Sequence, residues 1–189
     1  GGAVNGRGNI TPFAEFNTHF DPEAAHIVFE AFEAFDLSDW EATLAHGLLH
    51  ADVDAWCGAD SERARFYDAI SRQTRAWSGE RRGNRWHSAD SLAMAFALAP
   101  DPAETATHRL SVSLDGPGRG VTLVDWQDLG SRPANARILL RYPQKAFEAL
   151  VAKALAAEPQ TRVAGVVAVT DGLAVNTDRG SFYGGSTVP

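Results

Sequence analysis

The prediction of the fold depends on residues 91–98, whose sequence is Ser-Leu-Ala-Met-Ala-Phe-Ala-Leu. Single alanines separate the large side chains of this stretch, and that two-residue period is typical of a β-strand with one apolar face. Apolar residues before it recur at helical spacing, whereas residues after it alternate. We therefore expect helices in the first half of the chain and a sheet built mostly from the second half. A helix at residues 91–98 stays an alternative to the strand, because alanine has a high helix propensity.

Three helices are predicted before this stretch. The first begins at Asp21-Pro22, an N-cap followed by a proline in the first helical turn. The second begins with the capping box Ser38–Glu41 and runs to about His50. The third begins near Ser61, and its arginines are left to solvent while its apolar side is formed by Phe66, Tyr67, Ile70 and Trp77.

The second half of the chain predicts strands, turns and one further helix. The strands are Leu110–Leu114, Val121–Trp126, Ile138–Tyr142 and the hairpin Val163–Thr170 with Leu173–Asn176, with an early strand around Phe16, Thr18 and Phe20. A helix is expected to follow Pro143. These elements predict an α+β fold in which three N-terminal helices and one later helix pack on an antiparallel sheet of about five to seven strands. Residues 1–8 are expected to be a flexible N-terminus or a non-native remnant, and residues 9–189 a single domain.

Composition narrows the class of protein. The chain has 189 residues, a net charge of −7 and one cysteine, Cys57, so no internal disulfide can form. No stretch of the sequence is apolar enough to span a membrane, and no signal peptide is evident. We therefore expect a soluble, cytoplasmic protein that does not act at a membrane.

The charge is concentrated at the N-terminal end. The first sixty residues carry eleven acidic residues and a single basic one, and the sequence pI is about 5.3. This balance argues against nucleic acid as a partner and predicts either an ordinary solvated helix face or an acidic face that docks on a basic protein. The candidate contact residues for such a partner are Asp36, Asp39, Trp40, Asp52 and Asp54.

A metal site is the alternative interpretation. His46 and His50 are four residues apart, and Asp54 is the next position on the same face if the helix continues. These donors suit zinc or iron, with His26 as a further remote donor, but Gly47 excludes the zinc-protease motif. The main interpretation therefore has no cofactor. On that interpretation the two histidines are ordinary, partly exposed residues on one helix face, which is the simpler explanation of their spacing.

Other chemistry has less support. Cys57 could act as a thiolate beside a histidine, although a lone cysteine next to a tryptophan is more often buried and inert. Ser88 lacks the Gly-x-Ser-x-Gly elbow of a serine hydrolase, and the glycine-rich turn 115–120 lies between strands rather than before a helix. A biosynthetic enzyme with an apolar substrate pocket stays open, since such sites need few polar residues.

Three segments carry a family resemblance: Phe35–Trp40, the helix Ala146–Ala157, and the ending Asp178–Pro189. In this order along the chain they resemble the immunity protein 52 family. The resemblance implies an intracellular protein that binds and neutralises a toxin rather than an enzyme. The sequence thus favours a protein-binding domain, and the resemblance implies one of the immunity type with a basic toxin as its partner. The alternative is a small metal-dependent enzyme that holds an ion with His46 and His50, so whether the chain is an enzyme stays undecided.

Overall fold

The helices and strands are defined by a computed structural model, which describes residues 1–156 and the backbone of residues 167–169 and 173–175. The helices are α1 (Phe16–Phe20), α2 (Pro22–Ala31), α3 (Trp40–Ala45), α4 (His50–Cys57), α5 (Glu62–Arg82), α6 (Ala89–Leu98) and α7 (Gln144–Ala156). The strands are β1 (Phe35–Leu37), β2 (Leu48–Leu49), β3 (Arg85–Trp86), β4 (Glu104–His108), β5 (Leu110–Val112), β6 (Thr122–Val124), β7 (Ala136–Arg141), β8 (Val167–Val169) and β9 (Leu173–Val175). Strands β8 and β9 pair with each other and belong to a second unit of the chain, so the first unit, Gly1–Ala157, is considered by itself.

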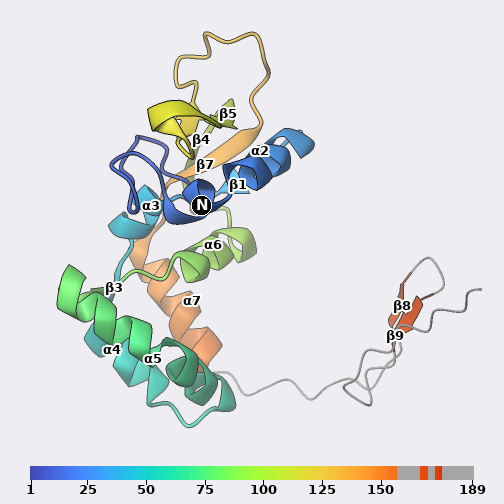
Figure 1. The fold of residues 1–189 in the computed structure, drawn as a ribbon. Helices are drawn as coiled ribbons and strands as arrows, with labels where there is room; N and C mark the ends of the chain where they lie inside the picture. Colours follow the sequence, from blue (N-terminus) through green and yellow to red (C-terminus); the bar gives the residue numbers. More distant parts are fainter. Residues whose placement is uncertain (157–166, 170–172, 176–189) are drawn as a thin grey trace, which may run out of the picture. The chain divides into compact units, whose positions relative to one another are not determined.

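The central strand of the first unit is β7 (Figure 1). It pairs in parallel with β1 and antiparallel with β4, and β5 and β6 form a separate antiparallel ribbon. Successive residues of β7 point to opposite faces, so Ile138 enters a core with Phe29 and Leu110, whereas Leu139 enters another with Phe96. The strand therefore holds two apolar cores together.

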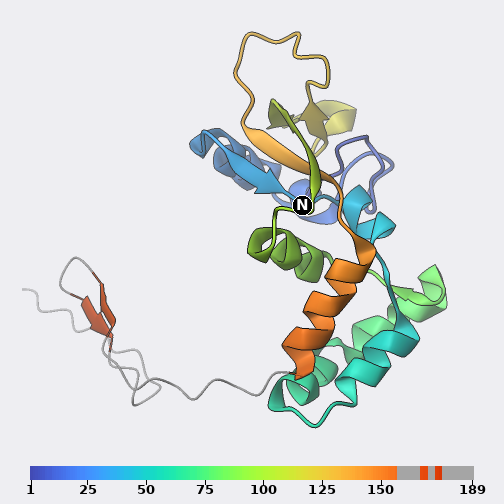
Figure 2. The ribbon, with the colours of Figure 1, turned by 180° about the vertical axis from the view of Figure 1, so that it is seen from behind.

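Helix α7 continues from β7 and carries the second core toward α4 and α5 (Figures 1 and 2). The rings of Tyr142 and Phe147, at the strand–helix junction and in the first turns of α7, are almost completely buried. The Tyr142 hydroxyl donates a hydrogen bond to the carbonyl of Ala99, 2.8 Å away, just after α6. These contacts fix α6 and α7 relative to each other.

The expected strand at residues 91–98 is wrong, because the segment is the helix α6. Leu92, Ala95 and Phe96 are buried, which is the three-and-four spacing of one helix face, while Met94 and Leu98 are 58% and 71% exposed. A strand would have placed all four large side chains on one side. Only two of the four large side chains are buried, so packing does not require a strand. The alanines, which are the best helix formers, then favour a helix.

The single helix expected from Ser38 to His50 is divided into two. Helix α3 ends at Ala45, and Leu48-Leu49 pairs antiparallel with Arg85-Trp86 before α4 begins at His50. Gly47 lies at this break, where an added Cβ would come within 2.9 Å of His87 Nε2. The N-cap of α3 is Asp39 rather than Ser38, since the Asp39 carboxylate accepts the backbone N–H of Ala42 at 2.8 Å.

The sheet also differs from the prediction. The strands of residues 1–156 form a three-stranded mixed sheet and two-stranded ribbons rather than one antiparallel sheet, because β1 pairs in parallel with β7. The early strand expected around Phe16–Phe20 is instead α1, whose first N–H groups are accepted by the Glu15 side chain. The α+β prediction is confirmed only in the broader sense of a mixed fold with helices and small sheets.

Several local predictions are confirmed. Asp21 and Ser61 are the N-caps of α2 and α5, and each side chain accepts a backbone N–H three residues on. The ribbon β5–β6, the strand β7 and the helix α7 lie where the sequence places them. Strands β8 and β9 fall inside the predicted C-terminal hairpin, whose remaining residues and the ending 178–189 lie outside the described residues.

Residues 1–8 pack against the rest of the unit instead of forming a free end. Ala3 and Val4 are buried, and the Val4 N–H donates to the Asp39 carboxylate at 3.0 Å. No described helix is long and apolar enough to cross a bilayer.

The assignment of α6 makes a direct prediction. Phe96→Ala should lower the free energy of unfolding by about 3–5 kcal/mol, since it leaves a cavity in the second core. Met94→Ala on the same helix should cost about 0.5 kcal/mol or less, because that side chain is largely exposed. Urea unfolding of both variants checks this, and equal losses would favour a strand with Met94 and Phe96 on one face.

Candidate functional site

A pocket lies between α5, α6 and α7, with a volume of about 310 Å³. Its walls are mostly apolar and are formed by Tyr67 from α5, by Met94, Ala95 and Leu98 from α6, and by Leu150, Val151, Ala154 and Leu155 from α7. Such a pocket is large enough for a planar ring system and offers it dispersion and stacking contacts rather than hydrogen bonds.

The polar end of the pocket is the first turn of α6. Asp90 and Ser91 both line the pocket, and Asp90 is exposed to solvent. The hydroxyls of Ser88 and Ser91 are 2.6 Å apart and hydrogen-bond to each other. Asp90 therefore places a carboxylate beside an apolar cavity, an arrangement that can hold a hydroxyl group or accept a proton from water.

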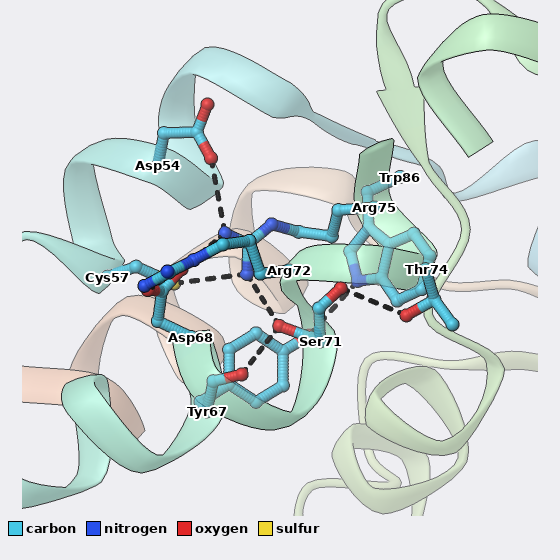
Figure 3. Close-up of polar contacts among 9 residues, drawn as sticks. All are labelled: Asp54, Cys57, Tyr67, Asp68, Ser71, Arg72, Thr74, Arg75 and Trp86. Carbon is cyan, nitrogen blue, oxygen red and sulfur yellow. Dashed lines mark hydrogen bonds and ion pairs between the residues drawn. The ribbon is translucent and has the colours of Figure 1, made fainter. Parts of the chain in front are cut away.

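The Tyr67 wall is fixed from behind by a hydrogen bond. Its hydroxyl accepts the indole N–H of Trp86 at 3.0 Å, which connects α5 to β3 (Figure 3). The ring is therefore held at the pocket wall with its oxygen already engaged. We expect the Tyr67 ring to contribute a surface for stacking.

Helix α5 is positioned by a buried guanidinium. Arg75, whose side chain is 7% exposed, donates to Asp68 at 2.6 Å and to the Ser71 hydroxyl, and lies 3.4 Å from Asp54 of α4 (Figure 3). Its other neighbour is the Cys57 sulfur, 3.5 Å away. This set of residues, Asp54, Cys57, Asp68, Ser71 and Arg75, is called the Arg75 cluster below.

The charges of the Arg75 cluster alter its proton equilibria. The pKa of Asp68 is lowered to about 2 by hydrogen bonds from Arg72 first and from Arg75 second. The pKa of Cys57 is raised, chiefly because its thiol is partly buried, although the Arg75 charge opposes the shift. The thiolate that a nucleophilic Cys57 would need is therefore disfavoured.

The two histidines predicted to bind a metal, His46 and His50, have different surroundings and do not form a metal site together. His46 is buried with both ring nitrogens engaged: Nδ1 lies 2.7 Å from the Ala42 carbonyl, and Nε2 accepts the backbone N–H of Tyr142 at 2.9 Å. His50 opens the next helix, and its Nε2 is buried without a partner. Within residues 1–156, no three His, Cys, Asp or Glu side chains are arranged to hold a metal ion.

The acidic contact candidates are likewise scattered. Asp39 is buried as a helix cap, and burial raises its pKa despite the hydrogen bonds it accepts. Asp36 pairs with Arg137 at 2.6 Å, and Asp54 faces Arg75. Trp40 lies under the guanidinium of Arg82, and Asp52 is half-buried on α4. These side chains do not form one free acidic face.

Asp90, Tyr67 and Arg75 were not singled out as functional residues from the sequence. Asp90 precedes the stretch expected to be a strand, so its place at a helix N-terminus was hidden by that assignment. A helical reading of residues 89–98, with an acid in the first turn, is the signal that would have found it.

Comparison with known proteins gives a consistent family. Residues 1–149 match the family model described as "Inosine-uridine preferring nucleoside hydrolase". The chain is 32% identical over 156 residues to the non-specific ribonucleoside hydrolase RihC of Escherichia coli (strain SMS-3-5 / SECEC), covering 82% of this chain and 50% of that protein. It is 28% identical over 161 residues to the pyrimidine-specific ribonucleoside hydrolase RihA of Enterobacter sp. (strain 638), with the same coverage.

Solved structures show the same relation. The plant nucleoside hydrolase PpNRh1 superposes with a TM-score of 0.74 at 25% identity, over 83% of this chain and 52% of that one. An inosine-guanosine nucleoside hydrolase superposes with a TM-score of 0.72 at 22% identity, which supports the fold alone. The chain spans about half the length of the relatives that it matches.

The depressed pKa of Asp68 predicts acid sensitivity. The folded-state pKa of about 2 lies below the ordinary value of 3.8, so the stabilisation is present above about pH 4 and is lost as the pH falls toward 2. Asp68→Asn should remove this part of the pH dependence and should be less stable than the parent at pH 7. Thermal unfolding between pH 2 and 7 measures the effect, with Asp101→Asn as the exposed control; identical profiles for parent and Asp68→Asn would contradict it.

Proposed function

The chain belongs to the inosine-uridine preferring nucleoside hydrolase family, and on this premise we propose that it takes part in hydrolysing the N-glycosidic bond of ribonucleosides. The observation that carries the proposal is the family match over residues 1–149, which include α5, α6 and the polar end of the pocket. The related hydrolases RihC and RihA, named for ribonucleosides, support the same class of substrate.

This membership corrects the main functional prediction from the sequence. The resemblance to the immunity protein 52 family is wrong, and with it the prediction of a non-enzymatic domain that binds a basic toxin. The segment Phe35–Trp40 is a strand followed by a helix cap, and residues 146–156 of the other segment belong to α7; such elements are too common to identify a family. The proposed partner is now a small-molecule nucleoside rather than a protein. The alternative prediction of an enzyme agrees better with the family than the main prediction does.

The pocket and Asp90 have complementary parts in the proposed reaction. Cleavage of an N-glycosidic bond develops positive charge on the ribose, while water attacks the carbon and the base leaves. The apolar walls around Tyr67, Met94 and Leu98 suit a planar base, whatever its hydrogen-bonding edge. The Asp90 carboxylate, at the open polar end, is placed to hold a ribose hydroxyl or to accept a proton from the attacking water.

A metal-dependent mechanism is compatible with membership of this family. A bound divalent ion would supply a more acidic water at neutral pH. The described residues do not fit such a site by themselves, because no three of their His, Cys, Asp or Glu side chains converge and His46 uses both ring nitrogens in hydrogen bonds to the backbone. We therefore assign no step to an ion, and zinc or iron bound by His46, His50 and Asp54 is not part of the proposal.

The test of this function is Asp90→Asn, which keeps the shape of the side chain and removes its charge. We expect the release of ribose from inosine and uridine to fall roughly 10²–10⁴-fold, because a carboxylate that accepts a proton contributes on that order. Calorimetric titration with the same nucleosides should show that binding in the pocket is retained.

The matched control is Asp101→Asn, an exposed aspartate in the turn after α6. It should leave both ribose release and nucleoside binding unchanged. A parent protein that neither binds inosine or uridine nor releases ribose would refute the proposed function, and unchanged turnover in Asp90→Asn would remove Asp90 from it.

A further inference from the structure

The only methionine of the chain, Met94, lines the pocket between α5, α6 and α7. The residue is 58% exposed, so solutes reach its thioether from the solvent. The thioether is polarisable and makes good contacts with flat rings, and it is also one of the side chains that dissolved oxidants attack most readily. Met94 therefore combines a contact surface for a ligand with a chemically sensitive atom.

The packing of α6 does not depend on Met94. The buried face of this helix consists of Leu92, Ala95 and Phe96. The end of the helix is held by the hydroxyl of Tyr142, which donates a hydrogen bond to the Ala99 carbonyl at 2.8 Å. A chemical change at the exposed Met94 therefore alters the pocket and leaves the core behind it in place.

The other sulfur of the chain, that of Cys57, is protected from the same oxidants. Its thiol is partly buried and lies 3.5 Å from Nη1 of Arg75. Peroxides react with the thiolate, and burial raises the pKa of Cys57, which keeps the thiol protonated. A mild oxidant should therefore modify Met94 before it modifies Cys57.

We propose that Met94 is a site of oxidation to methionine sulfoxide by peroxides, and that the sulfoxide weakens the binding of a planar apolar ligand in the pocket. The inference deepens the proposed function and rests on it for the identity of the ligand, a nucleoside. In the reaction a sulfur lone pair attacks one oxygen of hydrogen peroxide, the S–O bond forms and the O–O bond breaks. The proton of the transferred hydroxyl passes to the departing hydroxide, which leaves as water, so the sulfur is oxidised and the peroxide reduced.

The pocket lining gives the reason for weaker binding. A sulfoxide oxygen is a strong hydrogen-bond acceptor that water solvates, whereas the lining residues Leu98, Leu150 and Val151 have no donor in their side chains. A flat base that covers the oxidised Met94 would remove this water without replacing its hydrogen bonds. One uncompensated polar group of this kind lowers an affinity about tenfold.

The experiment exposes the full chain to hydrogen peroxide and locates the added oxygen by peptide mass spectrometry. We expect Met94 to be oxidised nearly as fast as N-acetylmethionine in the same solution, and Cys57 more slowly. Calorimetric titration should then show inosine and uridine bound about tenfold more weakly. Methionine sulfoxide reductases for both epimers, with dithiothreitol as the reductant, should restore the original affinity, because they remove the oxygen as water.

The matched variant is Met94→Leu, which keeps an apolar side chain of similar volume and has no sulfur to oxidise. Whatever its affinity before treatment, peroxide should leave that affinity unchanged. Thermal unfolding of the oxidised parent should stay within a few degrees of the untreated protein, since Met94 is outside the buried face of α6.

A second probe separates this inference from the proposed function. The dye anilinonaphthalene sulfonate becomes fluorescent on apolar surfaces, and the part of its signal that Ala154→Trp removes by filling the pocket reports the pocket itself. This part should fall when Met94 is oxidised. If it falls although neither nucleoside binds, the proposed function is refuted and the inference about Met94 stands. If ribose is released at the same rate before and after complete oxidation and the dye signal is unchanged, the function stands and the inference is overturned.

Four results would overturn the proposal outright. The first is a Met94 that stays unmodified while N-acetylmethionine is oxidised. The second is an equal loss of affinity in peroxide-treated Met94→Leu, which would place the effect at another residue. The third is a large drop in the unfolding temperature of the oxidised parent, because the loss would then come from unfolding. The last is a parent protein in which neither the nucleosides nor the dye bind the pocket.

Discussion

The buried guanidinium of Arg75 determines how the helical part of this protein is assembled. Its hydrogen bonds to Asp68 and Ser71 turn the polar side of α5 inward, and its contacts with Asp54 and Cys57 attach that helix to α4 (Figure 3). A buried charge is tolerated only when it is paired and hydrogen-bonded, so each partner constrains the others. The apolar residues of α5 are left outside as a consequence, and the Tyr67 ring is left at the wall of the pocket.

The second constraint is the strand β7, which separates and supports two cores. Ile138 and Leu139 enter different cores because adjacent side chains of a strand point to opposite faces. The same strand passes into α7 through Tyr142, whose backbone N–H is accepted by His46. A histidine that appeared suited to a metal is therefore a structural residue that joins α3 to the strand–helix junction.

The proposed function depends on the pocket that this packing leaves between α5, α6 and α7. The pocket between α5, α6 and α7 has one carboxylate, Asp90, beside Ser91 in the N-terminal turn of α6, and mostly apolar walls elsewhere. The proposal that this arrangement handles a ribonucleoside rests on family membership, because the geometry alone does not carry it. The chain spans about half the length of its relatives.

The sequence by itself determined the local elements whose signals are short-range. The caps at Asp21 and Ser61, the ribbon around residues 115–120 and the helix after Pro143 depend on neighbours within a few residues, and the structure has them where the sequence predicts. The strand predicted at residues 91–98 is wrong, because alternation with alanine fits both a strand and a helix until the core selects Leu92 and Phe96. The division of the helix at Gly47, the inward side of α5 and the surroundings of Asp90 were decided only by the tertiary structure. Each depends on residues distant in the sequence, such as Arg85 against Gly47 and Asp54 against Arg75, whose contacts form only when the chain packs.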